Sequence, residues 1–399
     1  MLTKGQTALL AGFAALAPLA IDMYLPAMPS LARDLGVSVD RAGQSISVFL
    51  VGIAGGQLIA GPLSDRFGRR PVILIGLALF LVSALIAALT TQFMLLLPAR
   101  LLQALGACSA MVAGRAIVRD RLDGVESARF FSLLALIGGM APVLAPLIGA
   151  GLIQLGSWRL IFWVMAGFSV LLLAGALPAL PETRSAETAA HARAERTSAA
   201  YWALLTNRAL AGYLLAAMCN SAAFFSYIAN SPVVLVGGYG LTPTTFSLLF
   251  GLNSIALVGA SQLNRVMLKT RNTDQMLALS ARNATILAAL TLLFAATDIG
   301  GLWVLSALFF FLAGSVAPVQ ANTMGGGLAV DPLRGGAAAA LFGAATFAGG
   351  AVASWLAGAL YDGTARGLCV VIALCLIGSA AAIRLLVLRR PLQPAEVRR

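Results

Sequence analysis

The stretch Gly61-Pro62-Leu63-Ser64-Asp65-Arg66-Phe67-Gly68-Arg69-Arg70-Pro71 decides the fold of this chain, because it joins two apolar segments that are each long enough to cross a bilayer. Its glycines allow a tight turn between two helices. Asp65 is placed to accept hydrogen bonds at a helix terminus or to pair with a basic neighbour. Any short basic inner loop explains the arginines alone, but it does not explain the whole ordered string.

The composition excludes a soluble globular protein. Of 399 residues, 60% are hydrophobic and 11% are charged, and the mean hydropathy is +0.91, whereas soluble domains average about 45–50% apolar and about 25% charged residues. Apolar runs of about 20 residues recur along the chain, and each predicts a membrane-spanning helix. Twelve are predicted, at 6–29, 42–63, 71–90, 93–114, 128–154, 157–179, 208–232, 243–264, 275–297, 300–322, 336–360 and 366–388. The sequence therefore predicts an all-α membrane protein.

The distribution of charge predicts the topology. With both termini in the cytoplasm, 22 of the 27 Lys and Arg residues lie on the inner side, as the positive-inside rule requires. The net charge of +12 is thus explained by orientation in the membrane, and a nucleic-acid partner is not expected. We expect a multi-pass protein of a bacterial inner membrane.

The first apolar segment contains a carboxylate, in Ala17-Pro18-Leu19-Ala20-Ile21-Asp22-Met23-Tyr24-Leu25-Pro26. A charged side chain at that depth costs at least about 2.5 kcal/mol, so it must face the bundle interior or a wet cavity. Asp22 is therefore a candidate functional residue.

The fourth segment contains an arginine, in Arg100-Leu101-Leu102-Gln103-Ala104-Leu105-Gly106. From the helix rise, Asp22 lies about 20–25 Å from the inner face and Arg100 about 10 Å from the outer face. In a core of about 30 Å these are similar levels, so the two charges could share one cavity. The alternative is that Arg100 extends to the outer headgroups.

These motifs resemble a known family. The string 61–71 is similar to the signature loop between helices 2 and 3 of the major facilitator superfamily. Together with Asp22-Met23-Tyr24-Leu25-Pro26 it resembles the bicyclomycin/chloramphenicol-resistance (Bcr/CflA) branch of the drug:proton antiporters. The resemblance implies two six-helix bundles around a central cavity. It also implies a conformational motif formed by Gly61, Asp65, Arg66, Gly68, Arg69 and Arg70.

The resemblance extends to two further segments. Arg100-x-x-Gln is similar to the helix-4 motif that the family links to proton coupling, with Ala104 where the family usually has Gly. The segment 138–151 looks like the family's antiporter motif, carried by Gly138, Pro142, Pro146 and Gly149. A kinked packing helix without directional meaning is the competing interpretation, since prolines bend helices and free backbone carbonyls.

A break in composition at 182–206 predicts a polar cytoplasmic linker between an N-terminal bundle, 1–181, and a C-terminal bundle, 207–399. The charged connection from Arg115 to Arg129 is either solvated or latches the inner face through paired charges, and the residues leave both open. The predicted helix 208–232 carries aromatic and amide side chains without charge, which suit a broad apolar pocket or simple helix packing. The predicted substrate-binding residues are Asp22, Tyr24, Phe224, Tyr227, Asn230 and Asn253.

These observations predict a transporter and not an enzyme. Burial raises the pKa of a carboxylic acid and a nearby arginine lowers it, so a conformational change around Asp22 would alter its proton affinity. The hypothesis is a proton-coupled antiporter that exports amphipathic antibiotics, with amphenicol- or bicyclomycin-like drugs suggested by the resemblance. Asp22 and Arg100 would couple the proton. The expected partners are a small-molecule drug, protons and the lipid bilayer, with no metal and no cofactor besides the proton gradient. Family precedent suggests a monomer.

Three alternatives remain open. The closest is an exporter of the same fold whose substrate is a metabolite, such as a sugar or amino-acid derivative. An intramembrane enzyme would need a catalytic dyad or a metal cluster within the bilayer, and the only histidine, His191, falls in the predicted linker. A channel would need a ring or ladder of charges along its pore, and no such pattern occurs.

Overall fold

The computed structural model describes residues 2–122, 124–185, 197–331 and 334–388, and over these residues the chain is helical with no strand. The first half contains α1 (Lys4–Asp22), η1 (Leu25–Ala27), α2 (Met28–Asp34), α3 (Val39–Phe67), α4 (Arg69–Leu89), α5 (Phe93–Arg121), α6 (Gly124–Leu155) and α7 (Arg159–Ala179). The second half contains α9 (Thr197–Leu205), α10 (Arg208–Pro232), η2 (Val233–Gly238), α11 (Pro243–Met267), α12 (Thr273–Thr297), α13 (Gly301–Leu328), α14 (Gly335–Ala359), α15 (Arg366–Ala382) and η4 (Ile383–Val387).

Eleven of the twelve predicted apolar segments each correspond to a long helix, and the first corresponds to a run of three helical pieces. Among the described residues, eleven helices, counted with the short pieces that continue them, are long and apolar enough to cross a membrane. The remaining segment, predicted at 128–154, lies in the 32-residue helix α6. The prediction of a helical membrane protein is therefore confirmed.

The first segment is not one continuous helix. It is divided into α1, η1 and α2, because Pro26 and Pro29 stand in the first turns of the two later pieces and cannot donate a backbone N–H to the preceding turn. Regular α-helix thus ends at Asp22. The break places the only acidic residue of the segment's apolar run where the helix stops.

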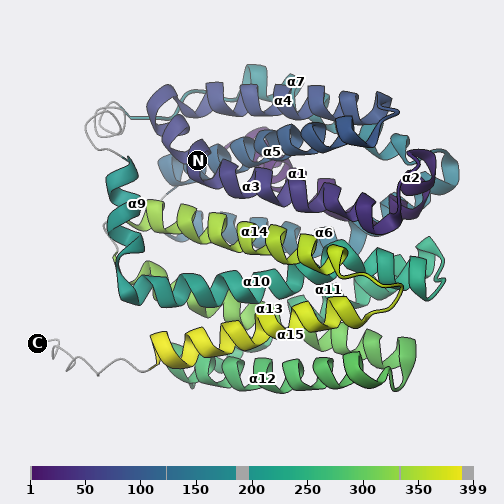
Figure 1. Ribbon diagram of the computed structural model, residues 1–399. Coiled ribbons are helices and arrows are strands. Elements are labelled where there is room, and N and C mark those ends of the chain that lie inside the picture. The colour runs from purple at the N-terminus through teal and green to yellow at the C-terminus, as the bar shows by residue number, and fades with distance from the viewer. Residues whose placement is uncertain (1, 123, 186–196, 332–333, 389–399) are drawn as a thin grey trace, which may run out of the picture.

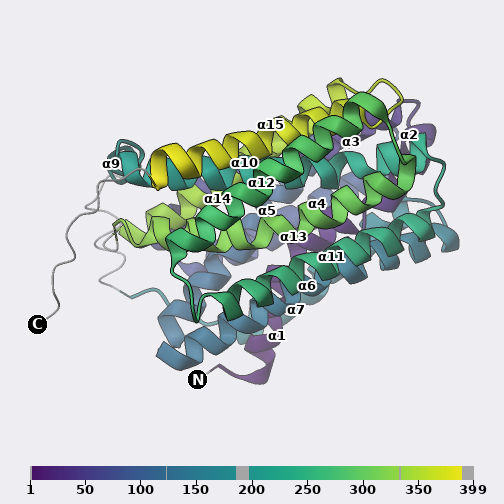
Figure 2. The ribbon, with the colours of Figure 1, turned by 90° about the horizontal axis from the view of Figure 1, so that it is seen from below.

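The two halves of the chain lie one above the other in Figure 1, with α1–α7 in the upper part and α9–α15 in the lower part. Figure 2 shows the long helices running side by side between an end near α9, called here the α9 end, and an end near α2, called the α2 end. The main contacts between the halves are made by α3 with α14 and by α6 with α11. The boundaries 1–181, 182–206 and 207–399 remain predictions.

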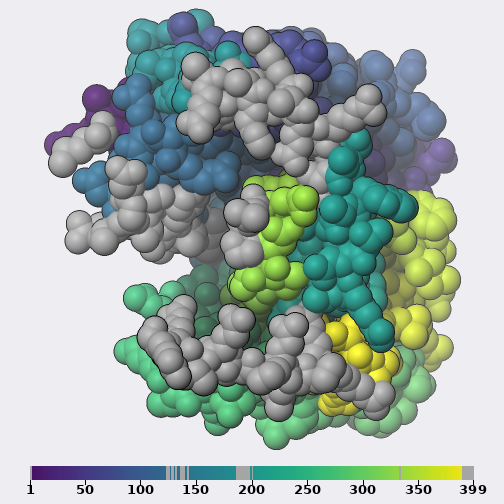
Figure 3. Space-filling model, turned by 90° about the vertical axis from the view of Figure 1, so that its left-hand side faces the viewer, coloured from purple at the N-terminus to yellow at the C-terminus, as the bar shows by residue number. Residues whose placement is uncertain are grey.

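The two interfaces between the halves differ in extent. Helices α3 and α14 approach each other over a long stretch, from Asp40 near Gly358 to Gln57 against Gly343. Helices α6 and α11 meet toward the α2 end, where the Ser247 hydroxyl donates to the Pro146 carbonyl over 3.1 Å. Figure 3 views the α9 end and shows a hollow between the blue surface of the first half and the green surface of the second. The molecule is therefore closed at the α2 end and hollowed at the α9 end.

We predict that Gly149 in α6 has no tolerated replacement, because a Cβ there would lie 2.0 Å from the Met23 carbonyl oxygen. Gly149→Ala would push α6 away from the break after α1 and destabilise the fold by about 1–3 kcal/mol, as overpacking does. Thermal unfolding of the protein in detergent measures this. The matched control is Gly151→Ala, since a Cβ on Gly151 would meet nothing within 4 Å. Equal unfolding temperatures for the two variants would contradict the prediction.

Candidate functional site

Asp22 is a buried carboxylate with no partner in the described part of the chain. It is the last residue of α1, and only 4% of its surface is exposed. Among the residues that the structure describes, none makes a hydrogen bond or an ion pair with it. An ionised carboxylate in such a place lacks the compensation that buried charges normally have. The site can therefore hold a proton or a polar ligand group.

Across from Asp22 lies an aromatic and amide surface of the second half, called here the aromatic wall. It is formed by Phe224, Tyr227, Phe250, Asn253 and Phe309. The Tyr227 phenol lies within electrostatic range of the Asp22 carboxylate. Its ring stacks on Phe250 at 5.6 Å and lies 4.7 Å from Phe309. The Asn253 amide donates to the phenol oxygen over 2.7 Å, so three helices, α10, α11 and α13, build this wall.

Arg100 does not pair with Asp22, although their similar depths in the sequence suggested one shared cavity. Its guanidinium is fully buried and lies over the rings of Phe49 at 4.4 Å, Tyr24 at 4.8 Å and Phe162 at 5.8 Å. It donates to the Ala20 carbonyl over 2.9 Å and to the Gln103 side chain over 2.7 Å. The electron-rich faces of aromatic rings attract the cation. The three rings stand between the guanidinium and the membrane surface. Extension to the headgroups is therefore excluded in this structure.

Two of the predicted substrate-binding residues have polar atoms that are hydrogen-bonded within the protein. Tyr24 is fully buried, forms one wall of the Arg100 cage and shares a 2.9 Å hydrogen bond with Ser45. Asn230 donates to the carbonyls of Ser226 and Ser354, which ties α10 to α14. The structure thus places Tyr227 near Asp22 and joins Phe224 and Asn253 to Tyr227, whereas Tyr24 and Asn230 are engaged in other contacts. The sequence could not reveal this, because their partners come from distant helices.

The conformational motif forms a compact charge cluster at the α9 end. Gly68 has φ +110°, which lets α3 stop and α4 begin without a longer connection. Only 3% of the surface of Arg69 is exposed, and its side chain forms ion pairs with Asp65 and with Asp120 of α5. Arg70 donates to the Leu177 carbonyl over 2.8 Å. Two other motif residues make fewer contacts: Arg66 lies over the Phe67 ring, and Gly61 faces open space.

The start of the predicted linker docks on this motif, which the sequence did not indicate. The Glu182 carboxylate accepts the backbone N–H groups of Arg69 and Arg70 over 3.0 and 3.2 Å, which are unpaired donors at the N-terminus of α4. Arg184 donates to the Asp65 and Arg66 carbonyls at the C-terminus of α3. Both helix ends at Gly68 are therefore capped by residues that follow α7.

The antiporter motif of α6 is described in part. The surroundings of Gly138 and Pro142 lie outside the described part of the chain. Pro146 accepts the hydrogen bond from Ser247 of α11, and Gly149 touches the Met23 carbonyl. The described part of this motif thus contacts both the helix of Asp22 and the second half of the chain.

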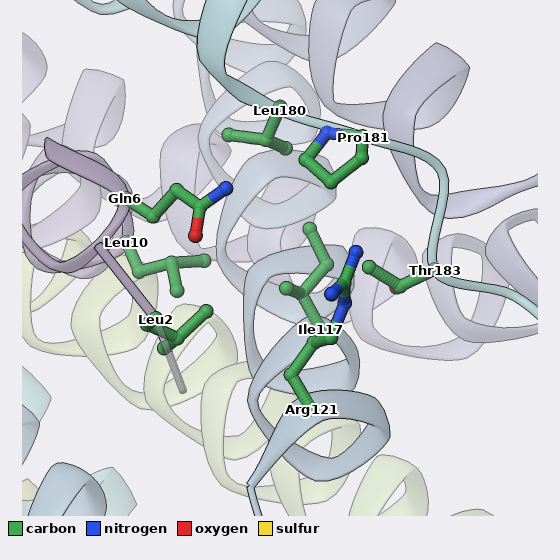
Figure 4. Close-up of a pocket in the computed structure, with 8 residues that line it drawn as sticks. All are labelled: Leu2, Gln6, Leu10, Ile117, Arg121, Leu180, Pro181 and Thr183. Atoms are coloured by element: carbon green, nitrogen blue, oxygen red, sulfur yellow. The ribbon is translucent and has the colours of Figure 1, made fainter.

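Two pockets lie apart from Asp22. The one in Figure 4, between α1, α5 and the segment after α7, has a volume of about 10 Å³, which is room for one water molecule. The other is a groove of about 1040 Å³ along α3, α10 and α14, lined mostly by apolar side chains such as Val51 and Val352. Both of these side chains are more than half exposed, as expected for a surface that contacts lipid.

We predict that Glu182 stabilises the motif in its ionised form. Burial alone would raise its pKa, but the backbone N–H groups of Arg184, Arg69, Arg70 and Thr183 outweigh burial and lower the pKa below its ordinary value of 4.5. A lowered pKa in the folded state stabilises the fold above pH 4.5, and this contribution is lost as the pH falls through the lower, folded-state value. Glu182→Gln should reduce the unfolding temperature at pH 7 by on the order of 2–4 °C.

Unfolding temperatures of the wild type and Glu182→Gln between pH 7.5 and 3.5 check this. The difference should shrink toward the acidic end. Glu126→Gln is the matched control, because Glu126 is an exposed glutamate with no such contacts among the described residues. A difference that stays constant with pH would assign the effect to shape and not to charge.

Comparison with known proteins agrees with this architecture. Residues 10–328 match the family described as Major Facilitator Superfamily. Multidrug resistance protein MdtL of Escherichia coli is 30% identical over 393 residues, 95% of each chain, and a bicyclomycin resistance protein homolog of Haemophilus influenzae is 27% identical over 367 residues, 92% of each. An uncharacterized MFS-type transporter, YdgK of Bacillus subtilis, is 38% identical over 255 residues, and the match spans 63% of the length of either chain.

Solved structures show the same fold. A D-xylose-proton symporter superposes with a TM-score of 0.72 at 15% identity, covering 96% of this chain and 97% of that one. The human organic anion transporter MFSD10 (TETRAN) gives a TM-score of 0.66 at 18% identity, covering 95% and 99%. The predicted fold, the transporter class and the resemblance to the Bcr/CflA drug efflux branch are therefore confirmed, and the chain belongs to the major facilitator superfamily.

Proposed function

We propose that this transporter is a proton-coupled antiporter that exports amphipathic antibiotics, with Asp22 as its protonation site. The observation that carries the proposal is the buried, unpartnered Asp22 carboxylate opposite the aromatic wall. Relatives named for bicyclomycin resistance and multidrug resistance support drugs as the substrate class.

Asp22 suits proton coupling because its surroundings can change. A carboxylate without a counter-ion is favoured in its protonated form when it is dry and in its ionised form when it is hydrated. Asp22 lies between the two halves of the chain, so a movement of one half against the other would alter its hydration. Arg100 is held in its cage of Phe49, Tyr24 and Phe162 and supplies no mobile counter-charge. We therefore assign to Arg100 the role of holding the end of α1, through the Ala20 carbonyl.

The aromatic wall suits an amphipathic substrate. Its rings offer a broad apolar surface, and the amide of Asn253 offers polar atoms at one point, a combination typical of small-molecule sites. None of its five residues is charged. An uncharged wall opposite one titratable acid lets substrate and proton compete for the same space without a fixed charge that would select one drug.

The structure corresponds to one state of an alternating-access cycle in this proposal. By the positive-inside rule, the α9 end with its arginines is cytoplasmic. The hollow at that end, with closure at the α2 end, then makes this the inward-facing state. Substrate would bind Asp22 and the aromatic wall from the inside, and rocking of the two halves would carry it outward.

We predict that Asp22→Asn abolishes coupled export. The amide keeps the size of the side chain but cannot take up or release a proton, so drug-dependent proton release in inverted vesicles should fall at least about tenfold, as loss of a group required for proton transfer does. The measurement compares a panel of amphenicols, bicyclomycin and unrelated antibiotics. Asp274→Asn in the exposed first turn of α12 is the matched control and should behave as the wild type.

The outcomes separate the alternatives. Proton release that survives Asp22→Asn would move the protonation site to another residue. A wild type that is silent with every drug would favour the exporter of a metabolite. That reading has its own support in the hydrogen bond of 3.0 Å between Ser221 of α10 and Gln320 of α13, a polar pair that could bind hydroxyl groups.

A further inference from the structure

Pro62 leaves a backbone carbonyl of α3 without its usual partner. The helix runs without interruption from Val39 to Phe67, with Pro62 inside it. In an α-helix, the carbonyl of residue 58 accepts the N–H of residue 62, and proline has no N–H to give. The Leu58 carbonyl therefore needs a donor from elsewhere, because an unpaired carbonyl in a membrane protein is costly.

Tyr201 supplies that donor. Its hydroxyl lies 3.2 Å from the Leu58 carbonyl oxygen and donates to it. Tyr201 is half-buried and belongs to α9, which follows the predicted linker. Helix α9 packs against α10 and α14, both in the second half of the chain. The hydrogen bond thus joins a helix attached to the second half with a helix of the first half.

We infer that Tyr201 is a positioning residue for the conformational cycle, which ties α9 to α3 through the carbonyl that Pro62 leaves free. The contact lies at the α9 end, on the side where α3 and α14 stay together. The α3–α14 contact continues beside it, since a Cβ on Gly343 would lie 2.7 Å from the Gln57 side chain, and the Leu58 side chain lines the apolar groove along α3, α10 and α14. The hollow of Figure 3 lies on the other side, between the blue and green surfaces.

This placement gives the contact a mechanical role. If rocking to the other state closes the edge between α6 and α11 at the α9 end, it turns α14, and α9 packed on it, relative to α3. A hydrogen bond at the α9 end of α3 stabilises the described state. Any state in which α9 moves away from α3 must break it and leave the Leu58 carbonyl unpaired. This movement does not depend on which substrate the protein carries.

The test measures the hollow directly, without substrate. Arg121 at the end of α5 and Arg265 near the end of α11 are both exposed and are each replaced by a spin-labelled cysteine. The four native cysteines are first replaced by alanine. The distance distribution between the labels reports the ratio of open to closed forms at the α9 end. Tyr201→Phe keeps the ring and removes only the hydroxyl. It should lower the ratio of the described state to the other state by roughly twofold to tenfold, the range of one neutral hydrogen bond.

The decisive variant is Pro62→Ala, because it returns a backbone N–H to the Leu58 carbonyl. In the Pro62→Ala background, Tyr201→Phe should shift the populations by less than about twofold, since the carbonyl then has a partner within α3. Tyr239→Phe is the matched control: that phenol donates to Asp298 within the second half, and its loss should leave the distances unchanged.

Two results would overturn the inference. The first is a distance distribution that Tyr201→Phe does not alter. The second is an equal shift by Tyr201→Phe with and without Pro62→Ala, which would assign the effect to the packing of α9 and not to the freed carbonyl. Because no drug or proton gradient is used, neither result bears on the proposed antiport of antibiotics.

Discussion

The first half of the molecule depends on the burial of one arginine. A guanidinium inside a membrane bundle must be held by the protein itself, because lipid offers it no compensation. Arg100 of α5 is held by Phe49 of α3, Phe162 of α7, Tyr24 after α1 and the Ala20 carbonyl of α1. Four segments thus converge on one side chain. Its hydrogen bond to the Ala20 carbonyl holds the last turn of α1, two residues before Asp22.

Prolines create the other constraint, since each one inside a membrane helix leaves a carbonyl that needs a new donor. The break at Pro26 ends α1 at Asp22, and close contact with Gly149 of α6 covers the exposed turn. Pro62 leaves the Leu58 carbonyl to Tyr201. Each of these prolines removes a backbone hydrogen bond of its helix at a place where another helix makes contact. The same residues that interrupt the helices also specify which neighbours they contact.

Much of the fold could be predicted from the sequence, because a bilayer imposes a simple rule of length and hydropathy. All twelve apolar runs are helical, the first as three successive pieces, and the loop 61–71 indicated the family. Partners of individual side chains could not be predicted in the same way. Tyr24 and Asn230 have the chemistry of binding residues, but distant helices occupy them. Glu182 reads as part of a solvated linker, and only the three-dimensional structure places it on the N-terminus of α4.

The separation of Asp22 from Arg100 limits how a proton could drive this transporter. If the two charges were paired, conformational change could act by making and breaking an ion pair. The positive charge of Arg100 is instead stabilised by aromatic faces and by the Ala20 carbonyl. The surroundings of Arg100 therefore need not change when Asp22 gains or loses a proton. The hydration of Asp22 and its distance from the Tyr227 phenol are then the quantities that differ between states. Both depend on how closely α1 and α10 approach, and this links protonation to the relative position of the two halves.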